Sequence, residues 1–89
     1  MTMRESQIEK ALVQQVKALG GEVRKVKWIG RNSAPDRLVM IKGNSFWAEL
    51  KAPGEKPTPA QAREHERMAR MGQRIEVIDS IERIQELLK

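Results

Sequence analysis

Two carboxylates and one ammonium stand where a small sheet could bring them together. Asp36 follows Pro35 directly, and Glu49, Leu50 and Lys51 come after twelve further residues. Carboxylate oxygens are ligands that Mg²⁺ and Mn²⁺ prefer, and such a cation neutralises phosphate charge and lowers the pKa of an attacking water. The Leu50 carbonyl can add a neutral oxygen ligand, and Lys51 can stabilise negative charge that develops on the phosphate. The group is therefore suited to hydrolysing a phosphodiester bond.

The segments around this group have the pattern of a β-hairpin. Residues 38–41 form a continuous apolar run, residues 42–45 have turn chemistry, and residues 46–51 alternate. Side chains alternate faces along a strand, so Glu49 and Lys51 share one face, with alpha carbons roughly 7 Å apart at ~3.3 Å per residue. The alternative is an ordinary edge strand whose charged residues face solvent, with Pro35-Asp36 only opening a turn.

A helix and a strand precede the hairpin. Helical spacing of apolar residues predicts a first helix over residues 5–19, which ends at Gly20 and Gly21. Residues 22–29 are predicted as a strand that leads into an exposed loop over residues 30–35. The stripe that this helix should bury consists of Ile8, Leu12, Val16 and Leu19.

A capping box marks the start of a second helix. Thr58 and Gln61 stand three residues apart, the spacing at which each side chain satisfies the other's backbone amide, and Pro59 occupies the first helical position. This helix is expected to run to Met71, with Gly72 as its stop.

A fourth strand and a last helix complete the chain. The strand is predicted over residues 75–78, and the helix is capped by Asp79 or Ser80. The order α-β-β-β-α-β-α predicts one α/β domain over residues 1–89, with a mixed central sheet flanked by helices. The apolar stripe of the last helix consists of Ile81, Ile84, Leu87 and Leu88.

The composition fits an intracellular protein, and its basic charge suits either a polyanion as partner or a soluble surface that happens to be basic. Lys and Arg number 17 against 12 Asp and Glu, a formal charge of +5, which favours a polyanion. Cysteine is absent, which excludes disulfides and thiolate metal sites and fits a reducing cytoplasm. The first ten residues are too polar for a signal peptide, and no apolar run approaches the ~18 residues of a membrane span.

Basic residues gather on the approach to Asp36, and we predict that they contact DNA phosphates. Ser33 joins them in this predicted surface. For the arginines of the second helix we favour pairing with Glu64 and Glu66 on a solvated face, and Trp28 and Trp47 are interpreted as core or dimer contacts. The basic residues before and at the start of the hairpin are Arg24, Lys25, Lys27, Arg31 and Arg37.

The ordered set of motifs resembles the PD-(D/E)XK nuclease superfamily and, within it, the virus-type replication-repair nuclease (VRR-NUC) domain. The likeness covers essentially the whole chain and implies a restriction-endonuclease-like core. It rests on Glu9, Pro35-Asp36, Glu49-Leu50-Lys51, Gln61 in Thr58-Pro59-Ala60-Gln61, and Gly72.

The resemblance implies a Mg²⁺- or Mn²⁺-dependent DNA endonuclease. Asp36, Glu49 and the Leu50 carbonyl would bind the metal, and Lys51 would assist the water. Glu9 would approach from the first helix as a further metal ligand, with Glu5, one turn earlier, as the alternative. The family's standalone members of this length are similar to phage-type homodimers that act on branched DNA such as four-way junctions.

Two residues and two rival functions stay open at this stage. Gln61 could support the site, cap the helix, or do both, whereas His65, a lone helical histidine, is interpreted as a packing or solvated residue and left out of the catalytic set. A double-stranded RNA-binding module shares the order α-β-β-β-α, but the start of the second helix lacks its lysine cluster and it gives Glu49 no task. A small regulatory subunit with an apolar sheet edge is the third interpretation.

Overall fold

The computed structural model describes residues 3–89 and has the element order that the sequence predicts. A four-stranded mixed sheet carries three helices, which confirms the α/β prediction, and the fourth strand has the predicted bounds. None of the helices between residues 3 and 89 is long and apolar enough to cross a bilayer. The elements are α1 (Glu5–Ala18), β1 (Glu22–Lys25), β2 (Arg37–Met40), β3 (Phe46–Leu50), α2 (Pro59–Arg70), β4 (Ile75–Ile78) and α3 (Ile81–Leu87).

The sheet places β3 between two neighbours. The strand order is β1-β2-β3-β4, with β1, β2 and β3 antiparallel in turn and β4 parallel to β3. The parallel step is made by α2, because a chain that leaves β3 needs a crossover before it can pair in the same direction. Since β3 is an interior strand, the edge-strand alternative for Glu49 and Lys51 is wrong.

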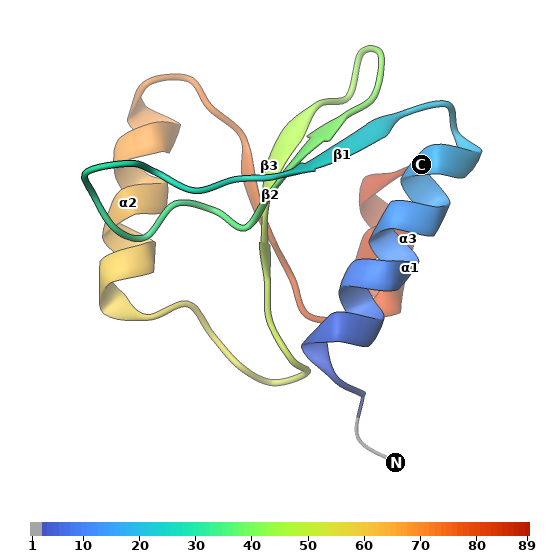
Figure 1. Ribbon diagram of the computed structural model, residues 1–89, viewed down its shortest axis with the longest axis horizontal. Coiled ribbons are helices and arrows are strands. Elements are labelled where there is room, and N and C mark those ends of the chain that lie inside the picture. The colour runs from blue at the N-terminus through green and yellow to red at the C-terminus, as the bar shows by residue number, and fades with distance from the viewer. Residues whose placement is uncertain (1–2) are drawn as a thin grey trace.

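Helices cover both faces of the sheet (Figure 1). The pair α1 and α3 lies on one side and α2 lies on the other. The core is concentrated between the sheet and the α1–α3 pair, where Phe46, Ala48 and Leu50 of β3 are at most 2% exposed. Full burial of a large aliphatic side chain contributes about 1.5–3 kcal/mol, so this layer supplies most of the fold's stability. The opposite layer, under α2, is left for polar groups.

The predicted apolar stripes are largely confirmed, with one exception. Ile8, Leu12 and Val16 of α1 are fully buried, and so is Ile84 of α3. The prediction is wrong for Leu19, which is 55% exposed. Helix α1 ends before it, and Gly20, at φ +79°, turns the chain away from the core at that point.

The first strand is shorter than predicted, because the chain leaves the sheet after Lys25. The amide of Val26 still donates to the Asp36 carbonyl at 3.0 Å, but from Lys27 onward the segment crosses to α2. There the indole nitrogen of Trp28 donates to Glu64 at 2.7 Å. Of the β-favouring residues at positions 26–29, Trp28 is thus used for a contact with a helix and not for strand pairing.

The capping box of α2 is confirmed. The backbone amide of Gln61 donates to the Thr58 hydroxyl at 3.1 Å. In return, the side-chain oxygen of Gln61 accepts from the backbone amide of Thr58 at 2.9 Å. Ser80, one of the two predicted caps, accepts from the Arg83 amide at the start of α3.

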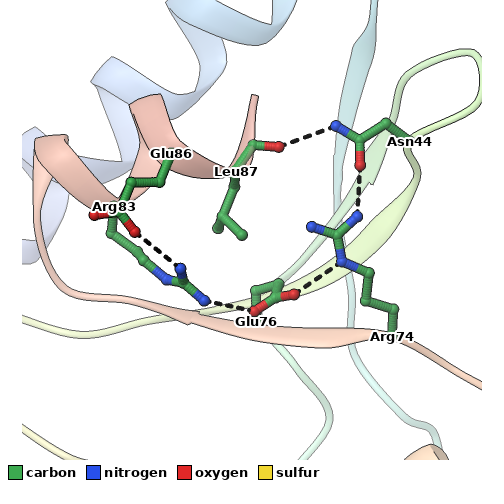
Figure 2. A network of polar contacts seen from close by, with 6 residues as sticks. All are labelled: Asn44, Arg74, Glu76, Arg83, Glu86 and Leu87. Atoms are coloured by element: carbon green, nitrogen blue, oxygen red, sulfur yellow. Dashed lines mark hydrogen bonds and ion pairs between the residues drawn. The ribbon is translucent and has the colours of Figure 1, made fainter. Parts of the chain in front are cut away.

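A polar network ties the hairpin turn to the last helix across β4 (Figure 2). The Asn44 side chain donates to the Leu87 carbonyl at 3.0 Å, and its oxygen accepts from Arg74. Arg74 and Arg83 both pair with Glu76, each at 2.8 Å. The network therefore connects the turn of the β2–β3 hairpin to α3. This contact opposes a shift of β3 along its neighbouring strands.

Candidate active site

The hairpin brings the two predicted carboxylates together. Arg37 pairs with Ala48 in the β2–β3 register, so the preceding Asp36 lies alongside the following Glu49. The Asp36 carboxylate accepts from the Leu50 amide at 2.7 Å, which fixes its orientation at the sheet end. Glu49 is only 1% exposed, beneath α2. The expectation that the charged face of β3 points away from the packed core is confirmed, but the face is covered and not solvated.

The environment of Glu49 disfavours its charge. Burial raises the pKa of Glu49 from 4.5 to about 8, and the hydrogen bond and negative charge of Asp36 add to this effect. Lys51 opposes the shift through its positive charge. At neutral pH Glu49 therefore holds a proton, because a buried carboxyl group beside a second acidic side chain ionises less readily than one in water.

This donor set fits a hard divalent cation. Two acidic side chains, one just before β2 and one on β3, provide oxygen ligands, and the charge of a cation between them would offset the burial that raises the pKa of Glu49. Between residues 3 and 89, no cluster of three or more acidic, histidine or cysteine side chains is arranged to hold a metal. For a cation held by Asp36 and Glu49, backbone and water oxygens would complete the coordination.

His65 lies directly over Glu49, which the sequence interpretation did not anticipate. Its Nε2 is 3.2 Å from Oε1 of Glu49, and its side chain is 13% exposed. Burial lowers the pKa of His65 from its ordinary value, which favours the neutral ring, and the contact with Glu49 is then a hydrogen bond. The sequence signal was the spacing from Gln61: four residues place both side chains on one face of α2.

The two glutamates of α1 have different surroundings. Glu9 forms an ion pair with Arg37, whose side chain is 13% exposed. Glu5 is exposed, and its negative charge is one of the influences that raise the pKa of Glu49. Thus Glu9 is engaged in an ion pair, while the charge of Glu5 is the smallest of the influences on the pKa of Glu49.

Gln61 is engaged at the start of α2, where its side-chain oxygen accepts from the Thr58 amide. The structure therefore gives it the capping role that the sequence left open. No contact between Gln61 and the acid pair is present among the described residues.

The basic residues before Asp36 fall into two groups. Arg31 and Arg37 are engaged by carboxylates, Arg31 with Glu64 at 3.1 Å and Arg37 with Glu9. Lys25 and Lys27 are exposed and form no ion pair in the part of the chain from residue 3 to 89. Arg24 pairs with Glu22, and Ser33 is half-buried with φ +72°.

Glu64 gathers three side chains from two segments. It accepts from Trp28 at 2.7 Å, from Arg31 at 3.1 Å and from Arg67 at 3.0 Å. Burial opposes ionisation of Glu64, but the hydrogen bonds from Arg67 and Trp28 and the charge of Arg31 outweigh it, so its pKa lies below 4.5. The predicted pairing with an arginine is confirmed, whereas the predicted solvated face is wrong here, because Glu64 is 5% exposed.

The pairing prediction holds in its original form two residues further along α2, where Glu66 contacts Arg70 at 3.2 Å and both side chains are exposed. The two tryptophans form an edge-to-face pair with ring centroids 5.7 Å apart. Since Trp47 is on the Glu49 side of β3, this pair lies on the same face of the sheet as the acid pair.

Comparison with known proteins agrees with the geometry of the site. The chain is 48% identical over 79 residues to "Putative nuclease p44" of Acyrthosiphon pisum secondary endosymbiont phage 1, covering 88% of this chain and 85% of the relative. It superposes on a solved structure described as a VRR_NUC domain with a TM-score of 0.85 and 37% identity, covering 94% of this chain and 92% of the other. No protein-family model matches the chain. The acid pair and its lysine lie on the fold that these relatives share, and the chain belongs to the VRR-NUC family of nucleases.

Proposed function

We propose that this nuclease is a Mg²⁺- or Mn²⁺-dependent endonuclease that hydrolyses phosphodiester bonds of DNA. The observation that carries the proposal is the pair formed by the half-buried Asp36 and the buried Glu49, in which the surroundings raise the pKa of Glu49 to about 8. A pair of this kind calls for a cation, and DNA is the polyanion that a formal charge of +5 would favour.

Each residue of the site has a distinct task in this proposal. Asp36, Glu49 and the Leu50 carbonyl hold the metal, and the Leu50 amide fixes Asp36. When bound, the cation supplies a water of lowered pKa and neutralises charge on the phosphate. Lys51 stabilises the negative charge that develops during attack. His65 is a positioning residue, because its hydrogen bond at 3.2 Å orients the Glu49 carboxyl.

The helix-one carboxylate of the proposal is chosen from Glu5 and Glu9. The family resemblance favoured Glu9, but Arg37 already engages that side chain. The influence of Glu5 on Glu49 supports Glu5 as the group that completes the site through a water. Gln61 supports the site indirectly, by fixing the start of the helix that carries His65.

The proposal extends to branched DNA, such as a four-way junction, and to a homodimer. A hollow of ≈ 290 Å³ beside the site exposes an apolar lining that includes Trp28, Trp47 and Met71, and Met71 is 76% exposed. A second copy would remove this apolar surface from water. The phage origin of the related nuclease and the absence of cysteine support a cytoplasmic location in a bacterial or phage-infected cell.

The test is cleavage of a four-way junction and a linear duplex with Mg²⁺ or Mn²⁺. We expect Asp36→Ala and Lys51→Ala to lower the cleavage rate by about 10²–10³ while DNA binding persists, since these groups act mainly on the transition state. The exposed neighbours Glu55 and Lys56 provide the matched controls Glu55→Ala and Lys56→Ala. Cleavage that survives both site substitutions would refute the assignment, and sedimentation would decide between monomer and dimer.

A further inference from the structure

The segment from Val26 to Pro35 presents an apolar tip that no other part of the described chain covers. Ile29, at this tip, is 99% exposed, more than any other large hydrophobic residue in the described structure. An added Cβ at the adjacent Gly30, where φ is +85°, would meet nothing within 4 Å. Figure 1 shows the segment leaving the sheet and crossing α2 before it returns to β2.

Contacts with α2 and β3 hold the tip in place. Trp28 and Arg31, the residues on either side of Ile29 and Gly30, are both hydrogen-bonded to the buried Glu64, at 2.7 and 3.1 Å. Trp28 also packs edge-to-face on Trp47. At the base of the segment the Val26 amide donates to the Asp36 carbonyl. An isoleucine held out in this way contributes no burial to the fold and presents its whole side chain to a partner.

The surroundings of the tip suit DNA better than protein. Lys25 and Lys27 precede it, and a hollow of ≈ 210 Å³ beside it has the exposed polar side chains of Lys27 and Asn32 in its lining. Cations and amides beside an apolar side chain are the combination with which proteins grip phosphates and insert a wedge between base steps. At its C-terminal end, the same segment leads directly into Asp36, which lies in the candidate active site.

We infer that residues 26–35 form a wedge whose Ile29 side chain enters between bases at the branch point of the DNA. This inference rests on the proposed function and specifies how the enzyme distinguishes branched from linear DNA. Base pairs at a branch are already partly unstacked, so the insertion is easier there than in a continuous duplex. Glu64 is the positioning residue that holds the wedge through Trp28 and Arg31.

The test measures unstacking directly, in a chelator and without cleavage. A four-way junction carries 2-aminopurine at the branch point, and its fluorescence is expected to rise when the wild-type protein binds. Ile29→Ser should abolish the rise and reduce the preference for the junction over a linear duplex about tenfold. Ile29→Leu, which keeps an apolar tip, should retain both. Leu19→Ser is the matched control, because Leu19 is also an exposed apolar residue but lies at the end of α1.

Each contrary outcome has a definite meaning. The inference is overturned if Ile29→Ser retains the fluorescence rise and the junction preference, or if the wild type binds the junction without a rise. It is also overturned if Ile29→Ser converts a dimer to a monomer in sedimentation, since the tip is then a contact between copies. Failure of the wild type to cut any DNA with Mg²⁺ or Mn²⁺ refutes the proposed function instead, and is read in a separate assay.

Discussion

At the scale of single residues, the protonation of Glu49 should couple metal binding to pH. Its pKa of about 8 lies well above the ordinary 4.5, so the metal-free site binds a proton that a cation must displace. We expect Mn²⁺ affinity to rise as pH increases from 6 to about 8 and then to level off. Calorimetry in buffers of different ionisation enthalpy should detect proton release at pH 7.

The Glu49→Gln variant is the control for that experiment. It cannot release the carboxyl proton, so its residual metal affinity should be weak and nearly independent of pH over the same range. The same shift has a consequence for stability: the metal-free protein is most stabilised by protonated Glu49 below pH 4.5, and loses this contribution as pH rises to about 8. If the metal affinity of Glu49→Gln depended on pH as steeply as that of the wild type, the assignment of the titrating group to Glu49 would be contradicted.

The two glutamates of α1 should be separable by substitution. Glu9→Gln removes the charge that pairs with Arg37, so we expect a loss of about 1 kcal/mol in the free energy of unfolding and a cleavage rate within a few-fold of wild type. Glu5→Gln removes a charge that acts on Glu49, and should lower cleavage about 10- to 100-fold with little effect on stability. Urea unfolding and single-turnover cleavage measure the two effects. The reverse pattern would make Glu9 the ligand.

At the scale of secondary-structure elements, α2 does more than connect two parallel strands. Its buried face supplies His65 to Glu49 and Glu64 to Trp28 and Arg31. The correct start of this helix therefore determines where both groups lie. The Thr58 and Gln61 capping box defines that start.

The capping role of Gln61 can be distinguished from a role in the site. Glutamate is also favoured at this position of a capping box, so Gln61→Glu should change the free energy of unfolding by less than about 0.5 kcal/mol, whereas Gln61→Ala should cost about 1 kcal/mol. We expect Gln61→Glu to cleave within a few-fold of wild type. A loss greater than tenfold in a variant with an intact cap would assign Gln61 to the chemistry. Thermal unfolding and cleavage rates measured on the same samples decide this.

The elements differ in how far the sequence predicts them. Local signals suffice for the start of α2 at Thr58 and for β4, because the capping spacing and the run of β-favouring residues act within the segment itself. They fail for the end of β1, because the chain leaves the sheet only to reach Glu64 on a helix 36 residues away. The burial of Glu64 and His65 is not predicted for the same reason: the spacing from Gln61 places His65 on a known face of α2, but nothing in α2 alone indicates that this face will meet the sheet.

The site shows the same division. Asp36 and Glu49 are predictable because hairpin register and strand parity place them together. The engagement of Arg37 by Glu9 is not, because it depends on how α1 lies against β2. Long-range packing thus decides which basic residues remain free for DNA.

At the scale of the whole molecule, the difference between paired and unpaired basic residues should appear in the salt dependence of DNA binding. Lys25→Gln and Lys27→Gln should each reduce the slope of log K against log salt by about one, because each removes a cation that is free to meet a phosphate. Arg37→Gln should leave the slope unchanged while lowering stability, since its charge is paired within the fold. Fluorescence anisotropy titrations with a linear duplex at several salt concentrations give the slopes. An equal effect of all three would show that the Arg37 pair opens on binding.

The division of the molecule into two layers also limits what substitutions can do. The layer between the sheet and the α1–α3 pair is apolar, whereas the layer under α2 contains the acid pair and the Glu64 cluster. Conservative changes at Val16 or Ile84 should therefore alter stability without altering the pH or metal dependence of cleavage. The two properties can be varied independently.

The alternation along β3 has one further consequence. Phe46, Ala48 and Leu50 pack in the core, whereas Glu49 and Lys51, which alternate with them, belong to the candidate active site. A slip of one position against β2 would exchange the two sets and place a lysine among the core side chains. The tight turn at Gly43 and the Asn44 contact with the last helix oppose such a slip. A misassembled hairpin would therefore be too unstable to persist, and nearly every molecule that completes folding should be competent to cut.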